Sequence, residues 1–217
     1  MKILVIGKGK MGNLIYEGLK EKYQNDKKIY IDQISFDKEV CPKKEYDYII
    51  DFSHPDSINY YRNIVSQRTK IVIGTTGFSN QQNEFLEFLS KMNPIVKDVN
   101  FSKGLILLKE ILFNIKNKII NYNILIEEKH HKSKVDSPSG TAIVLSKILK
   151  GDLIKSVRDE DYINEHKIVL NNNFEQLEIS HLVQDKKIYF KGIEESMDFL
   201  HNQKSGLFTY TDVLKWN

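Results

Sequence analysis

The sequence predicts an α/β protein: an N-terminal Rossmann dinucleotide-binding domain followed by a mixed α+β domain. Three observations predict this fold. Short apolar segments alternate with amphipathic segments through the first hundred residues, which is typical of a parallel sheet with right-handed crossovers. A glycine-rich segment directly follows the first apolar run. Beyond about residue 100 the alternation ends, and a long apolar segment and a hairpin pattern replace it.

The composition is that of a folded globular protein. The chain has 217 residues, of which 41% are hydrophobic and 28% charged, and a net charge of +3. A chain of this length buries about 70% of the surface that its unfolded form exposes. The composition excludes a disordered or fibrous protein. The net charge is too small to indicate a nucleic-acid partner by itself.

The sequence also indicates the compartment. No segment approaches the ~18 uncharged apolar residues of a membrane span. The apolar run at Ile3–Ile6 is too short for the core of a signal peptide. Cys41 is the single cysteine, so no internal disulfide can form, and a reducing compartment fits best. We therefore expect a cytoplasmic protein with no membrane partner.

The first half is expected to contain five strands and three helices. The strands are expected at Lys2–Ile6, Lys28–Phe36, Tyr46–Ile50, Lys70–Ile73 and Pro94–Val96. Each is a short apolar run, and most end at glycine or at a polar turn. Helices are expected at Gly12–Tyr23, Ser57–Ser66 and Gln81–Met92, where apolar residues recur at helical spacing.

The second half follows a different pattern, and we place the boundary near Asn100. Helices are expected at Leu105–Ile120, at Gly140–Lys150 and around 197–200, and a strand at Asn123–Glu127 that runs into a basic loop. His166–Leu170 and Gln176–Leu182 predict a hairpin, because the three asparagines between them favour a turn. Lys187–Phe190 is expected to form one more strand.

The first motif is the glycine loop. Residues 7–12 fit G-x-G-x-x-G after a strand and before a helix, the context that gives this pattern meaning. Gly7 permits the tight turn, Gly9 lets a pyrophosphate approach the backbone, and Gly12 allows close helix–strand packing. Lys8, Lys10 and Met11 complete the loop. The alternative is an ordinary glycine turn.

The end of the second strand predicts the ribose contact. Asp37 there suits the free 2′-hydroxyl of NADH, and Lys38 suits the 2′-phosphate of NADPH. The sequence thus leaves both cofactors open. The same two residues would also suit a solvated strand end.

Two further turns follow predicted strands. Residues 51–55 read D-F-S-H-P, and residues 74–78 read G-T-T-G-F. Ligands of open parallel sheets bind outside the carboxyl ends of the strands, so these turns converge with the glycine loop on one crevice. Phe52, Ser53, Gly74, Thr75 and Thr76 are the candidate cofactor residues here. Each turn taken singly is compatible with an ordinary loop.

The densest group of reactive side chains lies at Glu128–Ala142. Its histidines and lysines stop at a Pro-Ser-Gly-Thr segment that opens a helix, and free N–H groups at a helix start beside basic side chains favour a small anion such as a carboxylate. Histidine is the side chain best suited to deliver a proton near neutral pH. A metal site is disfavoured, because adjacent histidines point apart and no further ligands complete a set. The segment lacks the interleaved aromatic residues of a nucleic-acid site.

These residues resemble the 4-hydroxy-tetrahydrodipicolinate reductase (dihydrodipicolinate reductase) family. From Glu128 to Ala142 the chain matches the family signature E-x-H-H-x-x-K-x-D-x-P-S-G-T-A without a gap. The glycine loop, the D-F-S turn, the G-T-T-G-F turn and the N-F-S step at Asn100 also look like the family. So do Glu165-His166, residues 177–181 and residues 205–208, so that the resemblance covers nearly the whole chain.

The resemblance implies a reaction and roles for particular residues. It implies NAD(P)H-dependent reduction of 4-hydroxy-tetrahydrodipicolinate, a small dicarboxylate, in diaminopimelate and lysine biosynthesis. His130 would be the general acid, and Lys134 would hold a substrate carboxylate. The other substrate ligands would be His131, Ser139, Gly140 and Thr141. Asp98, Asn100 and Phe101 would complete the cofactor site.

The resemblance also implies an organisation. Residues 1–100 and 188–217 would form the dinucleotide-binding domain, and residues 101–187 the substrate-binding and oligomerisation domain. A homotetramer assembled through the sheet of the second domain is implied. Two departures stand out: the segment between Ala142 and Glu165 is shorter than usual and lacks two glycines, and Lys187 stands where the family often has arginine.

Two other functions are compatible with parts of this pattern. One is another reductase of the same fold, against which the intact His-His-x-x-Lys and Ser-Gly-Thr segments argue. The other is a nucleotide-binding sensor without catalysis, which would be expected to lose His130 or Lys134.

Overall fold

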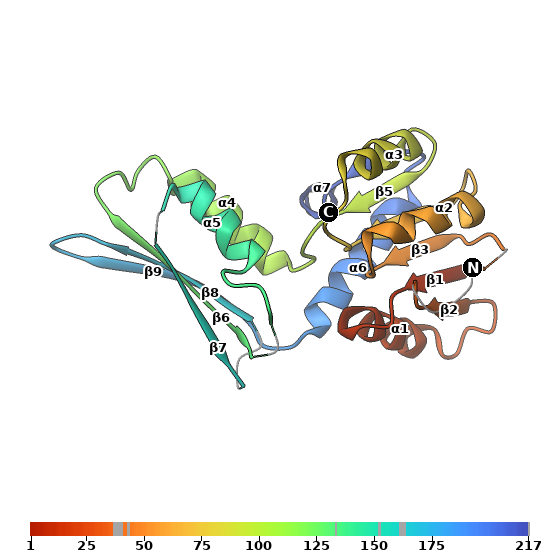
Figure 1. Cartoon of the computed structure of the whole chain (residues 1–217), viewed down its shortest axis with the longest axis horizontal. Helices are drawn as coiled ribbons and strands as arrows, with labels where there is room; N and C mark the ends of the chain where they lie inside the picture. The colour runs from red at the N-terminus through yellow and green to blue at the C-terminus, as the bar shows by residue number, and fades with distance from the viewer. Residues whose placement is uncertain (37–40, 43, 133, 152, 161–163, 217) are drawn as a thin grey trace. The chain divides into compact units, whose positions relative to one another are not determined.

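A computed structural model describes residues 1–36, 41–42, 44–132, 134–151, 153–160 and 164–216 of the chain (Figure 1). The chain divides into two compact units. Unit 1 comprises Met1–Phe101 and Tyr189–Asn217, and unit 2 comprises Ser102–Ile188. In the sequence, unit 2 is therefore inserted between the two segments of unit 1.

In the part of the chain that the structure describes, unit 1 contains a six-stranded sheet in the order β10-β5-β4-β3-β1-β2. Its strands are β1 (Lys2–Ile6), β2 (Tyr30–Ile34), β3 (Tyr48–Asp51), β4 (Lys70–Ile73), β5 (Pro94–Lys97) and β10 (Gly206–Phe208). All neighbouring strands run parallel, which confirms the predicted Rossmann-type α/β fold. β3 is buried along its whole length, because a parallel sheet is covered on both faces.

Helices cover this sheet. They are α1 (Lys10–Tyr23), α2 (Ile58–Ile64) after a 3₁₀ turn at Pro55–Ser57, α3 (Asn80–Ser90), α6 (Lys187–His201) and α7 (Tyr210–Trp216). Ile64 and Leu86 from α2 and α3 pack with Ile49 and Ile71 of the strands in one buried cluster. α3 begins with a capping box, in which Ser79 Oγ accepts from the Gln82 N–H and Gln82 Oε1 accepts from the Ser79 N–H. This cap fixes where the turn at residues 74–78 ends.

The strand predicted at Lys187–Phe190 is wrong, because these residues form the first turn of α6. The local run of isoleucine, tyrosine and phenylalanine favours a strand. The buried positions recur instead at helical spacing from Tyr189 to Leu200, and this longer pattern decides the structure. A Cβ on Gly192 would lie 2.1 Å from the Phe101 carbonyl oxygen, so the helix passes directly against the backbone there. β10 and α7 were not predicted.

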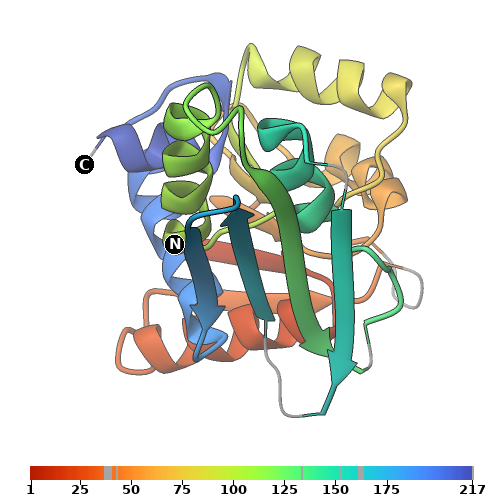
Figure 2. The same cartoon turned by 90° about the vertical axis from the view of Figure 1, so that its left-hand side faces the viewer.

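Unit 2 contains a four-stranded sheet in the order β7-β6-β8-β9 within the described residues. The strands are β6 (Asn123–His131), β7 (Leu153–Asp159), β8 (Asn164–Asn171) and β9 (Gln176–Val183). β6 and β7 run parallel, and the other pairs run antiparallel, so the predicted mixed α+β domain is confirmed. Helices α4 (Lys103–Ile115) and α5 (Gly140–Leu149) lie on one face of this sheet (Figures 1 and 2).

The apolar core of unit 2 lies between the sheet and these helices. Ile126 and Ile168 are fully buried and cluster with Leu112 of α4 and Leu145 of α5. The predicted hairpin is confirmed as β8 and β9, and the Asn172 side chain accepts hydrogen bonds from two N–H groups in its turn. β6 continues four residues beyond its predicted end, through the segment expected to be a basic loop. β7 was not predicted.

Within the described residues, no helix is long and apolar enough to span a membrane.

Candidate active site

The glycine loop between β1 and α1 combines two structural glycines with one that leaves open space. Gly7 has a φ of +120°, and a Cβ there would lie 2.2 Å from the Phe52 carbonyl oxygen. A Cβ on Gly12 would lie 2.1 Å from the Gly7 carbonyl oxygen. The Cβ position of Gly9, at the start of α1, meets no atom within 4 Å. Gly7 and Gly12 are therefore required by the fold, whereas Gly9 leaves room at the helix start for a phosphate group.

A cavity of about 430 Å³ opens beside this loop. It is lined by residues that follow β1, β2 and β3: Gly7, Lys8, Gly9, Ser35, Phe36, Phe52, Ser53 and His54. Ser35, Phe36 and His54 were not among the predicted cofactor residues, although all three follow a strand at the same sheet edge. The rings of Phe36 and His54 are stacked, with centroids 5.8 Å apart. The cavity and its glycine cradle suit the phosphates of a dinucleotide.

Asp51, at the end of β3, organises the next two turns. It is fully buried. Its Oδ1 accepts from Ser53 Oγ at 2.6 Å and from Thr75 Oγ1 at 2.8 Å, and its Oδ2 accepts from the hydroxyls of Tyr61 and Ser57. Burial raises the pKa of Asp51, and these hydrogen bonds oppose the shift only in part. The carboxylate thus ties together two predicted cofactor residues, Ser53 and Thr75, that are 22 positions apart in the chain.

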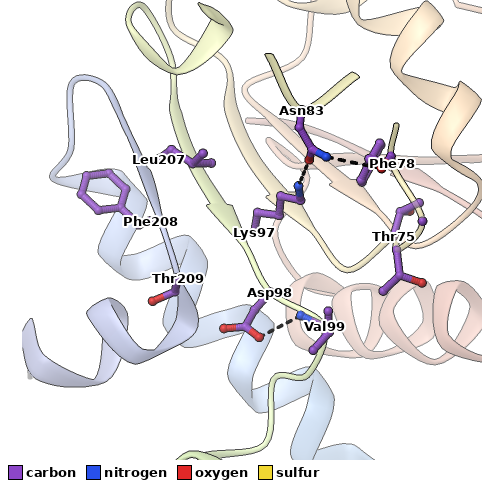
Figure 3. A pocket seen from close by; sticks show the side chains of 11 residues that line it. Thr75, Phe78, Asn83, Lys97, Asp98, Val99, Leu207, Phe208 and Thr209 are labelled. Atoms are coloured by element: carbon purple, nitrogen blue, oxygen red, sulfur yellow. Dashed lines mark hydrogen bonds between the residues drawn. The ribbon is translucent and has the colours of Figure 1, made fainter. Parts of the chain in front are cut away.

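A second cavity of unit 1, of about 580 Å³, lies at the ends of β4, β5 and β10 (Figure 3). The predicted residues Thr75, Thr76 and Asp98 line it. Lys97, which was not predicted, points its amino group toward Asn83 Oδ1 and lies 4.9 Å from the centre of the Phe78 ring (Figure 3). Burial lowers the pKa of Lys97. Its position as the last residue of β5, at the carboxyl edge, is the signal that could have found it.

Three more of the predicted cofactor residues, Asp98, Phe101 and Gly74, have structural neighbours in unit 1. Asp98 accepts from the Tyr210 N–H at 3.1 Å and from the N–H groups that follow it in the chain. The Phe101 ring is 2% exposed and packs between Phe52 and Tyr210. A contact of Phe101 with a cofactor would therefore come from its backbone. A Cβ on Gly74 would lie 2.0 Å from the Phe52 ring. Asp37 and Lys38 lie outside the described residues.

In unit 2, one end of the helix-covered sheet face is polar. Residues two apart on a strand share a face, so Glu128 and His130 continue the face that buries Ile126. Two neighbouring rows cross the sheet here. The first contains Ser156, Glu128, His166 and His181, and the second contains Arg158, His130 and Asn164. Glu128, Arg158 and His166 were not among the predicted site residues, although the i, i+2 spacing of E-x-H is the signal for one strand face.

His130 is held by a carboxylate at the centre of this cluster. It is 6% exposed, and its Nδ1 hydrogen-bonds Glu128 Oε2. Glu128 is fully buried, and its other oxygen accepts from Arg158 Nη2 at 2.8 Å and from the Ser139 N–H at 3.3 Å. The His130 Nε2 atom is therefore the ring nitrogen turned away from this carboxylate.

Opposing effects set the ionisation of this pair. Burial alone would raise the pKa of Glu128, but hydrogen bonds from Arg158 and Ser156 and the charges of His130 and Arg158 lower it overall. The pKa of His130 lies below its usual value, because burial, together with the charges of Lys134 and Arg158, lowers it more than the charge and the hydrogen bond of Glu128 raise it. Glu128 is therefore ionised at neutral pH and favours the protonated form of His130.

His166 lies beside His130, with ring centroids 5.2 Å apart. Its Nε2 is 3.4 Å from Ser139 Oγ, and its Nδ1 is buried without a hydrogen-bond partner among the described residues. Burial and the charges of His130 and His181 lower the pKa of His166 to about 3. His166 is therefore neutral at physiological pH, and of these two buried rings only His130 is held by a carboxylate.

The segment after β6 brings further predicted residues to this cluster. The charge of Lys134 reaches both His130 and His166, and its Nζ pairs with Asp136 at 2.8 Å. Ser139 caps α5 by accepting from the Ala142 N–H at 3.2 Å. Gly140 and Thr141 form the first turn of α5, and the Cβ position of Gly140 meets no atom within 4 Å. Space is therefore open at this helix start.

His131 is the predicted residue that the structure does not bring to the cluster. It is the last residue of β6, and alternation along the strand places it on the opposite face from His130, with Lys129 and Glu127.

Among the residues that the structure describes, no group of three or more histidine, cysteine, aspartate and glutamate side chains is arranged to hold a metal ion.

The chain combines two features: a Rossmann-type unit whose glycine loop follows a strand, and a unit that contains a buried histidine among basic groups. This combination is that of an NAD(P)H-dependent oxidoreductase. The sequence matches the family description "Dihydrodipicolinate reductase, N-terminus" over residues 1–101 and "Dihydrodipicolinate reductase, C-terminus" over residues 104–214. The chain belongs to the dihydrodipicolinate reductase family.

Individual relatives agree with this family. A 4-hydroxy-tetrahydrodipicolinate reductase of Thermosipho africanus is 32% identical over 99% of this chain and 98% of its own. The enzyme of the same name from Wigglesworthia glossinidia brevipalpis is 37% identical over 82% of this chain and 70% of its own. The structure resembles a dipicolinate-bound dihydrodipicolinate reductase of Paenisporosarcina sp. TG-14, with a TM-score of 0.70 and 18% identity over 96% and 97% of the two chains, a likeness of fold.

The reaction of this chain is the NAD(P)H-dependent reduction of 4-hydroxy-tetrahydrodipicolinate to tetrahydrodipicolinate. The substrate is a small dicarboxylate.

Proposed function

We propose that His130 is the general acid of this reduction. When bound, the nicotinamide cofactor supplies the hydride, and the reduced ring then requires one proton. His130 delivers that proton from Nε2, because its Nδ1 is engaged by Glu128. This engagement, in a cluster of basic groups beside the start of α5, is the observation that carries the assignment.

The substrate carboxylates are proposed to bind at the same end of unit 2. Lys134 provides a positive charge near His130, and the N–H groups at Gly140 and Thr141 lie in the open first turn of α5. Ser139 holds this helix start in place. We retain His131 as a predicted carboxylate ligand, although it lies on the other face of the sheet, so its contribution is expected to be smaller than that of Lys134.

The cofactor is proposed to bind along the carboxyl edge of the unit 1 sheet. The open space at Gly9 suits the pyrophosphate. Ser53 lines the cavity beside the glycine loop, and Thr75 and Thr76 line the second cavity at the ends of β4, β5 and β10. Asp37 and Lys38 together are expected to let NADH and NADPH both bind.

The chain is further proposed to form a homotetramer in the cytoplasm. One face of the unit 2 sheet has no helix against it within the described residues, and it exposes Leu153 and Leu182 beside the ion pair of Lys167 with Glu178. Apolar side chains next to such pairs suit contact with a second copy. Sedimentation at four times the chain mass is expected, and a monomer at micromolar concentration would contradict it. The single cysteine fits a reducing compartment.

Steady-state oxidation of NAD(P)H, with substrate generated from aspartate semialdehyde and pyruvate by the preceding synthase, tests the proposal. General acid catalysis is typically worth about 10²–10⁴-fold, so His130→Gln should lower kcat by that range with a modest change in KM. Lys134→Ala should raise KM and also lower kcat if its charge is felt in the transition state. His201→Gln, at an exposed position of α6, is the matched control and should leave both constants unchanged. A folded His130→Gln enzyme with parental kcat would refute the role of His130.

A further inference from the structure

The polar end of the unit 2 sheet contains a buried acid that the proposed reaction does not itself require. Glu128 is 0% exposed, although neither of its oxygens is needed to bind a substrate or to transfer a proton. Burying a carboxylate is costly unless hydrogen bonds and opposite charges compensate. The partners of Glu128 therefore indicate which part of the site the buried carboxylate holds in place.

Those partners come from three separate elements. Oε2 meets His130 Nδ1 on the same strand, and Oε1 accepts from Arg158 Nη2 of β7 at 2.8 Å and from the N–H of Ser139, the residue that caps α5. Arg158 Nη2 also donates to the Asp136 carbonyl oxygen at 2.6 Å. The carboxylate thus joins the proton donor to the chain segment that presents Lys134.

We propose that Glu128, held by Arg158, is the positioning residue of the active site: it turns Nδ1 of His130 to the carboxylate and leaves Nε2 as the nitrogen that delivers the proton. The inference rests on the proposed role of His130. It adds a residue that acts through His130 and does not itself touch the substrate. An imidazole held at Nδ1 by a carboxylate has one defined tautomer when neutral and a stabilised cation when protonated.

The charges around His130 predict in which direction its pKa moves when one of them is removed. Glu128 is its anionic neighbour in the cluster, whereas Arg158 on β7 and Lys134 after β6 oppose its protonation, and neutral His166 on β8 packs against its ring with His181 on β9 beyond. Asp136 is engaged by Lys134. Loss of the Glu128 charge should therefore lower the pKa of His130, whereas loss of the Arg158 charge should raise it.

The test is a titration of the ring nitrogens by NMR in ¹⁵N-histidine-labelled protein, with His130→Gln used to assign the His130 signals. In the parental protein, neutral His130 is expected to carry its proton on Nδ1. Glu128→Gln should lower the midpoint of the His130 titration by about 1–3 pH units, the usual effect of an adjacent charge, and Arg158→Gln should move it upward. Glu127→Gln, one residue away on the opposite face of β6 and paired with Lys155, is the matched control and should shift it little.

A buried arginine without its carboxylate could prevent folding of Glu128→Gln. The double variant Glu128→Gln/Arg158→Gln removes both charges and should still lower the midpoint, because Glu128 contacts the ring and Arg158 lies beyond it. An unchanged midpoint and tautomer in both folded variants would overturn the proposal.

Kinetics separates this proposal from the assignment of His130. If the NMR midpoint shifts in Glu128→Gln but the pH profile of kcat/KM does not, Glu128 positions His130 but His130 is not the proton donor. If the profile of the parental enzyme follows the His130 titration and Glu128→Gln moves neither, His130 is the donor and Glu128 is only structural. The proposal expects both to shift together, with kcat/KM at neutral pH reduced about tenfold or more.

Discussion

Two buried carboxylates, Asp51 in unit 1 and Glu128 in unit 2, have opposite surroundings. Both are fully buried. Asp51 is surrounded by hydroxyl groups and backbone, and burial raises its pKa. Glu128 lies between a guanidinium and an imidazole. Burial alone would raise its pKa, but the hydrogen bonds from Arg158 and Ser156 and the charges of His130 and Arg158 together outweigh burial and lower it.

The difference teaches what each carboxylate is for. Neutral donors fix the position of an acid without requiring a cation beside it, which suits a turn that must keep its shape. A carboxylate beside a guanidinium stays ionised, and its charge in turn favours the protonated form of an imidazole that it contacts. Asp51 therefore holds the geometry of the turns that are proposed to bind the cofactor, whereas Glu128 is proposed to set the protonation state of His130.

The largest effect is expected on stability at Asp51. Asp51→Ala would leave the buried hydroxyls of Ser57 and Tyr61 without their acceptor, at about 1–3 kcal/mol each before relaxation. Thr75 would lose its shorter hydrogen bond, to Oδ1, and keep only the one to the Asp51 carbonyl oxygen. We expect a loss of about 3 kcal/mol or more in the free energy of unfolding, measured by denaturant titration. Asp51→Asn keeps one acceptor oxygen and should lose clearly less. Equal stability of Asp51→Ala and the parent would show that this network is not structural.

The next effect concerns acid stability and His166. The unfolded chain binds a proton at this residue near pH 6.5, whereas the folded protein binds it only near pH 3. The folded state binds fewer protons in this range, so stability contributed by neutral His166 is fully present above pH 6.5. It is lost as the pH falls toward 3, at about 1.4 kcal/mol per pH unit.

Denaturant unfolding between pH 4 and 7 measures this slope. His166→Gln should show a shallower loss of stability toward acid than the parent. Identical slopes for the two proteins would mean that His166 is protonated in the folded state.

The smallest effect is expected at an exposed ion pair. Lys132 and Glu160 form a salt bridge near the polar cluster, but their side chains are 61% and 68% exposed. Such pairs contribute between about 0 and 1 kcal/mol. Lys132→Gln should change the midpoint of thermal unfolding by no more than one or two degrees. A larger loss would mean that exposed charges near the site matter as much as the buried pair of Arg158 with Glu128.

Much of unit 1 could be predicted from sequence because its signals are local. Each central strand is a short apolar run, and the glycine loop requires Gly7 and Gly12 for reasons that the motif alone states. The start of α6 was mistaken for a strand because Ile188-Tyr189-Phe190 has strand character over three residues. The burial of Ile193, Met197 and Leu200 became informative only over the whole helix.

The candidate site was only partly predictable because its contacts join distant residues. The histidines and Lys134 were found through one continuous motif. Arg158 on β7 reaches Glu128 on the neighbouring strand β6, 30 positions earlier in the chain, and no spacing in the sequence signals that pair. The likeness of Asp51 and Glu128 as buried acids is equally invisible there, because their partners come from elements brought together only by folding.

The pH dependence of kcat/KM in Glu128→Gln and Asp51→Asn, side by side, tests the contrast between the two carboxylates most directly. A general acid must be protonated, so activity falls as the pH rises above the pKa of His130. Glu128→Gln should move this fall to lower pH by about one unit or more, because the charge that favours the imidazolium is gone. Asp51→Asn should leave the fall at its parental pH, whatever it does to KM for the cofactor. A fall that shifts equally in both variants, or in Asp51→Asn alone, would contradict the account.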